Sequence, residues 1–141
     1  MTDAKTPRVL SLLEGLAAPI QALANGAFTT VGPWNCGGDW QAWLESGGGK
    51  GIRVAMSAGA DKFDADLFQH LPDLEAVVVF GAGYDGLDAN VAKARGIVID
   101  NAGWQHAGEV ADHALGMALA LRRRLFEADR WVREGRWTQA R

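Results

Sequence analysis

This 141-residue sequence predicts an α/β fold built on a parallel sheet, and two observations carry the prediction. Short apolar, β-branched runs alternate along the chain with segments that have helix signals, which is the order of strands joined by helical crossovers. The run 74–80 is apolar and rich in valine, which is typical of a strand buried on both faces of a parallel sheet. With 48% hydrophobic and 22% charged residues, the composition is that of a folded domain with a core.

The expected elements follow one another in regular order up to about residue 100. Strands are expected at 8–13, 52–56, 74–80 and 97–100, with a less distinct edge strand within 27–38. Helices are expected at 15–25, 39–46, 64–71 and 87–95. Asp39 and Asp88 are placed as helix N-caps, Pro72 ends the third helix, and Gly96 closes the fourth.

A single long helix is expected from Gly108 to about Arg133, with Gly135 ending it. Its apolar stripe consists of Val110, Ala114, Met117, Leu121, Leu125, Ala128 and Val132, widened by Ala111, Leu115, Ala118 and Leu119. Because a small sheet cannot cover so long a stripe, a second domain or a second subunit is expected to do so.

Charge and cysteine content exclude several classes of protein. The net charge of -3 leaves no electrostatic footprint for nucleic acid, and no run approaches the ~18 apolar residues of a membrane span. The polar N-terminus lacks the apolar segment of a signal peptide. Cys36 is the one cysteine, so no disulfide can form within the chain. A soluble, cytoplasmic protein is expected.

The most informative motif is G-A-G-Y-D-G at 81–86, directly after the strand expected at 74–80. Glycines there let backbone N–H groups approach an anion such as a carboxylate. We do not interpret the motif as a dinucleotide fingerprint, which needs G-x-G-x-x-G opening a helix with an acidic residue ~20 positions on. The spacing of Gly81, Gly83 and Gly86 is taken to differ from that motif, and Asp85 and Asp88 would repel a pyrophosphate. Ordinary turn chemistry is an equally open alternative.

A second small-residue turn, S-A-G-A, begins at Ser57, after the strand expected at 52–56. Strands of a parallel sheet end at the same edge, so this turn is expected beside the glycine motif. Together the two turns could bind one small acid. A tight strand-to-helix connection is the alternative and remains open.

The three histidines, His70, His106 and His113, lack the spacing of a metal site, and no metal is expected. A histidine–carboxylate catalytic pair is not excluded by the sequence. A histidine on a helix, such as His113, is more often a structural or interface residue.

The segment from about 71 to 137 closely resembles the D-isomer-specific 2-hydroxyacid dehydrogenases, nearest to their glyoxylate/hydroxypyruvate reductase-like branch. The residues that carry the resemblance are L-P-D-L-E-A-V-V-V-F-G-A-G-Y-D-G-L-D, A-K-A-R-G-I-V-I-D-N, V-A-D-H-A-L-G-M-A-L-A-L-R-R-R and E-A-D-R-W-V-R-E-G-R-W. They cover nearly half the chain, in order and at the family's spacing. The first 50 residues share only the strand–helix rhythm.

The resemblance implies two domains with a cleft between them. Residues 1–101 would form a flavodoxin-like substrate-binding domain, and 102–141 the crossover and first helix of a Rossmann cofactor domain. It also implies that backbone amides at Ala82 and Gly83 bind the substrate carboxylate, and that Ser57 and Ala58 line the same cleft.

The rest of the implied arrangement concerns the cofactor and the partner. Val110, at the start of the long helix, would face the nicotinamide of NAD or NADP. The helix from Val110 to Val132 would form a homodimer interface. The family reaction is hydride transfer between NAD(P)H and a small 2-oxo acid such as glyoxylate or hydroxypyruvate.

The family's dinucleotide motif and its catalytic arginine, acid and histidine lie beyond the position of Arg141, so the resemblance assigns no catalytic residue here. The expectation is therefore a truncated dehydrogenase that is inactive alone. A free-standing flavodoxin-like module that binds a small acid or regulates another protein is the alternative.

Overall fold

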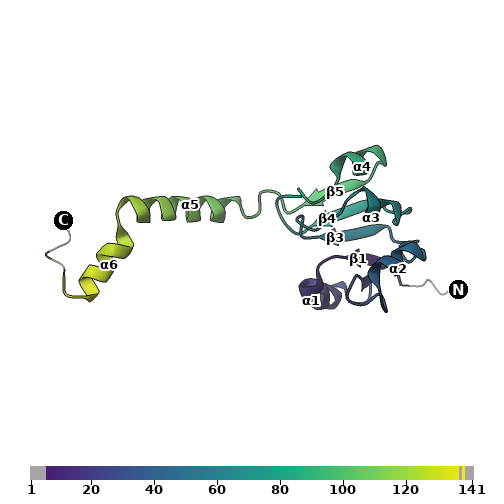
Figure 1. Cartoon of the computed structure of the whole chain (residues 1–141), viewed down its shortest axis with the longest axis horizontal. Coiled ribbons are helices and arrows are strands. Elements are labelled where there is room, and N and C mark those ends of the chain that lie inside the picture. Colours follow the sequence, from purple (N-terminus) through teal and green to yellow (C-terminus); the bar gives the residue numbers. More distant parts are fainter. Residues whose placement is uncertain (1–5, 137, 139–141) are drawn as a thin grey trace. The chain divides into compact units, whose positions relative to one another are not determined.

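The computed structural model of the chain describes residues 6–136 and 138 (Figure 1). The chain divides into two compact units, Met1–Gly103 and Trp104–Arg141. Unit 1 holds all the described strands and helices α1 to α4, and unit 2 holds α5 and α6.

Unit 1 is built on a five-stranded sheet in which every pair of neighbouring strands is parallel, in the order β2-β1-β3-β4-β5. The strands are β1 (Arg8–Ser11), β2 (Thr29–Val31), β3 (Val54–Ser57), β4 (Ala76–Val79) and β5 (Val98–Asn101). This strand order is that of flavodoxin-like proteins. The predicted α/β fold with a flavodoxin-like parallel sheet is confirmed, and the less distinct edge strand is β2.

Four helices connect these strands: α1 (Glu14–Ala24), α2 (Trp40–Glu45), α3 (Ala65–Gln69) and α4 (Ala89–Ala94). Two predicted N-caps are confirmed by their hydrogen bonds. The Asp39 carboxylate accepts from Ala42 N at 2.9 Å, and the Asp88 carboxylate accepts from the amides of Asn90 and Val91, each at 3.1 Å.

One face of the sheet carries most of the core. Leu10, Ala55 and Val77 lie side by side across β1, β3 and β4, and none of the three is exposed. Residues of α2, α3 and α4, among them Leu44 and Phe68, complete this cluster. The other face has a smaller cluster. It comprises Val9, Leu13 and Met56, with Ile20, Phe28, Val54 and Val78 packed against it.

Two strands, β1 and β3, end at buried serines, and each serine hydroxyl accepts a hydrogen bond from an amide of the turn that follows. β1 ends at Ser11, two residues before the predicted end, because Leu13 N donates to Ser11 Oγ at 3.1 Å and Leu13 then precedes α1. β3 instead runs one residue beyond its predicted end, since Ser57 pairs with Val79 of β4. Both changes concern strand ends, which apolar patterns define poorly.

Unit 2 corrects one prediction. The single helix expected from Gly108 to about Arg133 is two helices, α5 (Ala107–Arg122) and α6 (Leu125–Arg133). Arg124, between them, takes a left-handed conformation with φ of 52°, which a continuous α-helix does not allow.

Contacts of the Arg124 side chain stabilise the break. Arg124 Nε donates to Glu127 Oε2 at 2.5 Å, within the first turn of α6. The guanidinium carbon also lies 5.4 Å from the centre of the Trp131 ring, in cation–π range. The left-handed residue is therefore held by two partners that both belong to α6.

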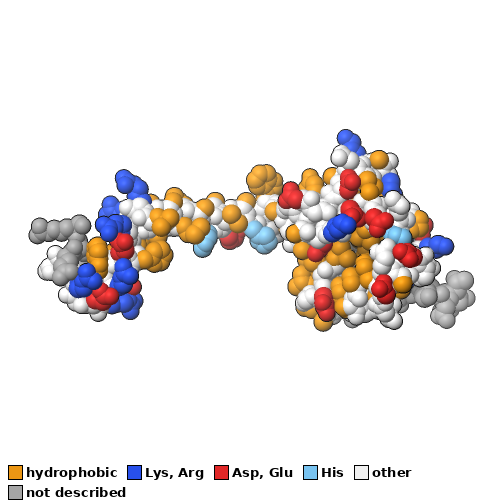
Figure 2. Space-filling model, viewed as in Figure 1, with side chains coloured by type: hydrophobic (Ala, Val, Ile, Leu, Met, Phe, Trp, Pro, Cys, Tyr) orange, Lys and Arg blue, Asp and Glu red, His pale blue; other side chains and the backbone are white. Residues whose placement is uncertain are grey.

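Apolar side chains line α5 and α6 without a cover, as Figure 2 shows along α5. The most exposed large ones are Val110, Leu115, Met117, Leu119, Leu121, Leu125, Phe126 and Val132. The predicted stripe is thus largely exposed in the part of the chain that the structure describes, and its expected cover, a second domain or a second subunit, stays a prediction. Within residues 6–136 and 138, no helix is both long enough and apolar enough to cross a membrane.

Candidate functional site

The two small-residue turns lie against each other at the carboxyl ends of β3 and β4. Phe80 N donates to Ser57 O at 2.9 Å, and Gly86 N donates to Gly59 O at 2.8 Å. A parallel bridge between Phe63 and Leu87 continues the contact. The prediction that these turns are neighbours is confirmed, although the turns lie one strand away from the β1/β3 switch point of this strand order.

Two glycines make this approach possible. A Cβ on Gly59 would overlap the Gly83 carbonyl oxygen, and Gly59 also has a φ of +90°. A Cβ on Gly86 would overlap the Asp61 carbonyl oxygen. The turns are thus interlocked through backbone atoms, with no room for a side chain between them.

The predicted anion-binding amides, those of Ala82 and Gly83, are held in a fixed orientation from the β5 side. Ala102 N donates to Gly81 O at 3.1 Å, and Asn101 Nδ2 donates to Ala82 O at 2.7 Å. In a planar trans peptide the N–H points opposite to the carbonyl. Hence the N–H groups of Ala82 and Gly83 both point away from Asn101 and Ala102.

These two N–H groups have the properties of an anion cradle. Ala82 and Gly83 are exposed, and within the described part of the chain neither amide donates to a protein acceptor. Successive backbone N–H groups that point to the same side form a concave site for an anion. Asn101 has no ligand-like pattern around it in the sequence, so sequence reasoning missed its part in this geometry.

The hydrogen-bond donors of Ser57 and Ala58, unlike the amides of Ala82 and Gly83, are already bonded to Asp61. Asp61 Oδ2 accepts from Ser57 Oγ at 2.9 Å and from Ala58 N at 2.6 Å. Ser57 Oγ in turn accepts from Gly59 N at 2.9 Å. Sequence reasoning did not single out Asp61, because aspartate side chains in turns usually bond backbone amides that follow them, whereas Asp61 accepts from an amide three residues before it.

The spacing of the three glycines in the motif does not by itself identify the ligand. Gly81, Gly83 and Gly86 do stand at the G-x-G-x-x-G spacing of a dinucleotide fingerprint, and Asp100 follows about 20 positions after Gly81. The expectation that the spacing differs from the fingerprint is therefore wrong, and spacing does not exclude a nucleotide.

The structure argues against a nucleotide at this loop. A pyrophosphate would need the free N-terminus of a helix that starts within the motif. Here α4 starts only at Ala89, has 6 residues, and its first free amides are bonded to the Asp88 carboxylate. These residues do not fit a dinucleotide phosphate, and the role of the Ala82 and Gly83 amides as a carboxylate site stays a prediction.

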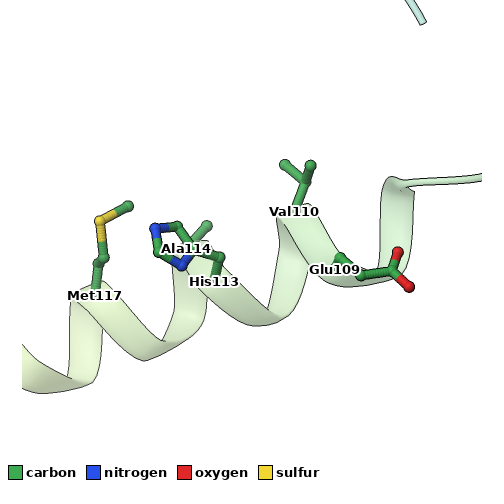
Figure 3. Close-up of a pocket in the computed structure, with 5 residues that line it drawn as sticks. All are labelled: Glu109, Val110, His113, Ala114 and Met117. Atoms are coloured by element: carbon green, nitrogen blue, oxygen red, sulfur yellow. The ribbon is translucent and has the colours of Figure 1, made fainter. Parts of the chain in front are cut away.

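Val110, the predicted cofactor contact, lies on α5 in unit 2. Its side chain is exposed and borders an open depression along the helix with Glu109, His113, Ala114 and Met117 (Figure 3). The surface there is mostly apolar, and the role of Val110 stays a prediction. Among residues 6–136 and 138, no three histidine, cysteine or acidic side chains gather as metal ligands would.

The comparisons with known proteins agree with this fold. A family model described as D-isomer specific 2-hydroxyacid dehydrogenase, catalytic domain, matches residues 48–135. Because that match covers more than half of the chain, the protein belongs to this dehydrogenase family, as the motifs predicted.

Curated relatives include a glyoxylate/hydroxypyruvate reductase A from Arabidopsis thaliana, 47% identical over 88 residues, or 62% of this chain and 28% of the relative. A glyoxylate reductase from Korarchaeum cryptofilum is 40% identical over 91 residues, or 64% of this chain and 27% of the relative. The chain thus spans less than a third of the length of these relatives.

Solved structures extend the likeness over almost the whole chain. A 2-hydroxyacid dehydrogenase from Ketogulonicigenium vulgare has a TM-score of 0.78 at 31% identity, covering 96% of this chain and 42% of its own. An NADPH-dependent glyoxylate/hydroxypyruvate reductase from Sinorhizobium meliloti, solved with NADP and malonate, has a TM-score of 0.69 at 32% identity, covering 96% and 40%.

Proposed function

We propose that this chain supplies the substrate-binding part of an NAD(P)-dependent reductase of small 2-oxo acids such as glyoxylate or hydroxypyruvate. The observation that carries the proposal is the pair of amides at Ala82 and Gly83, both exposed and both oriented by bonds to their neighbouring carbonyls. Support also comes from the relatives, whose names specify glyoxylate or hydroxypyruvate as substrate.

In this proposal the substrate carboxylate accepts hydrogen bonds from the two amides, which are positioned before binding and cost little reorganisation. Charge-assisted bonds of this kind are short and directional, so they also fix where the adjacent 2-oxo carbon lies. Ala58, which is exposed, lines the wall of the same site, and Ser57, which is fully buried, lies behind it. Their hydrogen-bonding groups are held by Asp61, so they shape the site without binding the carboxylate directly.

The proposal assigns the two parts of the chain different roles. Residues 1–101 form the substrate-binding domain, and 102–141 the crossover and first helix of a cofactor domain, with Val110 facing the nicotinamide of NAD or NADP. The cofactor supplies the hydride when bound, and residues outside these 141 bind its phosphates. The chain by itself is therefore proposed to bind substrate without turning it over.

A homodimer and a cytoplasmic location complete the proposal. The helical stretch from Val110 to Val132 would meet a second copy through its uncovered apolar side chains. A single cysteine fits a reducing compartment.

Titration of the ¹⁵N-labelled chain tests the carboxylate site. We expect hydroxypyruvate to shift the amide resonances of Ala82 and Gly83 in a saturable manner. Glycolaldehyde, which lacks the carboxylate, serves as the matched control and should leave both resonances in place at the same ionic strength. If neither hydroxypyruvate nor glyoxylate moves these two resonances, the proposed function is wrong.

A second measurement separates an enzyme part from a complete enzyme or a free-standing binding module. We expect the chain mixed with NADPH and hydroxypyruvate to leave the NADPH absorbance unchanged, although hydroxypyruvate binds. Addition of a chain that carries the cofactor domain should start NADPH consumption. Turnover by the 141 residues alone would contradict the proposal, and saturable binding that never leads to turnover with any added cofactor domain would favour the binding module.

A further inference from the structure

We infer that Asp61 is a positioning residue for the carboxylate site, acting through the turn 57–61 on the Ala82–Gly83 amides. The inference rests on the proposed function, which uses these amides, and adds a residue that the sequence motifs do not single out. Asp61 need not touch the substrate. Its carboxylate sets the shape of one backbone turn, and that turn sets the position of another.

The first step is the closure of the turn. Two donors, Ser57 Oγ and Ala58 N, converge on Asp61 Oδ2, at 2.9 Å and 2.6 Å. Ser57 is fully buried, and its Oγ also accepts from Gly59 N at 2.9 Å. The side chain of Asp61 thus ties together the three residues that precede Ala60, and without it the Ser57 hydroxyl and the Ala58 amide lose their shared acceptor.

The second step is the contact of this turn with the glycine motif. Gly86 N donates to Gly59 O at 2.8 Å. Gly59 packs against the Gly83 carbonyl, and the Asp61 carbonyl packs against Gly86, both so closely that neither glycine has room for a Cβ. These contacts join backbone to backbone, with no flexible side chain between, so a change in the turn must shift the glycine motif.

The third step places the amides between two supports. Asn101 Nδ2 holds the Ala82 carbonyl from the β5 side, while the turn of Asp61 abuts the Gly83 carbonyl from the β3 side. The Ala82 carbonyl belongs to the Ala82–Gly83 peptide and the Gly83 carbonyl to the next peptide, so Asn101 holds the Ala82–Gly83 peptide directly and the turn holds it through Gly83. Removal of one support leaves the peptide free to rotate, and the two N–H groups then no longer converge on one carboxylate.

Three variants test the inference by hydroxypyruvate binding. Asp61→Ala removes the acceptor and should weaken binding by about tenfold or more, which corresponds to the loss of ~1.4 kcal/mol. Asp61→Asn keeps an oxygen acceptor for Ser57 Oγ and Ala58 N, so it should restore the affinity to within about twofold. Asp39→Ala is the matched control. It removes a carboxylate that accepts one amide bond on α2, and should lower thermal stability but keep the affinity.

Amide resonances recorded without ligand give a second, independent readout. Asp61→Ala should shift the resonances of Gly83 and Gly86 relative to the wild type, and Asp61→Asn should shift them much less. If Asp61→Ala does not fold, Ser57→Ala, which removes one of the two donors to Asp61 and the acceptor of Gly59 N, should shift the same resonances.

The inference is overturned if Asp61→Ala, or Ser57→Ala in its place, leaves the Gly83 and Gly86 resonances where the wild type has them. It is also overturned if Asp61→Ala binds hydroxypyruvate as the wild type does, or if Asp39→Ala weakens binding equally. A wild-type chain that binds no 2-oxo acid would end the proposed function. The ligand-free resonances would still decide whether Asp61 positions the glycine motif.

Discussion

Backbone amides, rather than ionisable side chains, carry the recognition chemistry proposed for this chain. At the two turns, the identity of a residue matters mainly because glycine has no side chain. Gly59 and Gly86 lack the Cβ atoms that would separate the two turns. Ala82 and Gly83 present their N–H groups because Ala102 and Asn101 hold the carbonyls of the preceding residues, Gly81 and Ala82. Side chains such as Asp61 and Asn101 act on these amides through the backbone.

A comparison of two glycines tests this view at the residue scale. Gly59→Ala introduces a Cβ against the Gly83 carbonyl at a φ of +90°, and should lower the free energy of unfolding by about 3 kcal/mol or more. Gly96 has a similar φ of +69°, but a Cβ there meets nothing within 4 Å. Gly96→Ala should therefore cost only the conformational strain of about 1 kcal/mol.

Chemical denaturation of both variants measures the difference. Equal losses of stability would show that the left-handed conformation alone is costly and that the turns can separate to accept a side chain. Only the larger loss at Gly59 agrees with interlocked turns.

At the scale of elements, a single carboxylate caps the start of each of α2, α3 and α4. The ion pair with Lys62 and the bond from Leu67 N hold the pKa of Asp64, the N-cap of α3, below its usual range. A carboxyl group whose pKa is lower in the folded state stabilises the fold above its unfolded pKa. That contribution is lost as the pH falls through the folded pKa.

Asp64→Asn isolates the charge, because asparagine keeps the capping oxygen. The wild type should be the more stable protein near neutral pH. The difference should shrink as the pH falls below ~4, the ordinary pKa of aspartate, and vanish once Asp64 is protonated. Denaturation at a series of pH values measures it, and a difference that does not change with pH would rule out this electrostatic account. High salt should also reduce it, since Lys62 is largely exposed.

The break between α5 and α6 is an element that the sequence pattern could not reveal. Leu121, Leu125 and Ala128 keep helical spacing across it, so periodicity alone predicts one continuous helix. The hydrogen bond of Arg124 to Glu127 and its cation–π contact with Trp131 stabilise the break. Both depend on a side-chain conformation that the spacing of apolar residues does not specify.

At the scale of the whole molecule, the main feature is the exposed apolar surface of unit 2. Leu121 is 74% exposed, and Phe126 is 75% exposed. We expect the chain to associate with a second copy in a concentration-dependent manner, which sedimentation at several concentrations would measure. A wild-type chain that stays monomeric, monodisperse and heat-stable at every concentration would contradict this expectation.

A pair of substitutions locates the association. Leu121→Glu places a charge on the stripe and should shift the chain to monomers without lowering the stability of unit 1. Leu23→Glu, at an even more exposed leucine of α1 in unit 1, should leave the association unchanged. Equal effects of the two would place the contact elsewhere.

The sequence by itself determined the fold class, the order of the elements, the helix caps and the family. These features depend on local patterns: apolar runs, glycines, carboxylates at helix starts and motifs that lie close together along the chain. The pairing of the 57–61 turn with the glycine motif was also predictable, because parallel strands end at the same edge of a sheet.

Only the tertiary structure decided how the glycine motif is placed relative to α4 and the 57–61 turn. Its spacing fits a nucleotide loop as well as a carboxylate cradle, and the position of α4 with its Asp88 cap distinguishes them. The contacts of Asp61 and Asn101 were likewise visible only in the structure. Asn101, for example, bonds to Ala82, which lies 19 residues away in the chain. Hydrogen bonds depend on distances in space, and a linear pattern does not contain the distance between two loops that the sheet brings together.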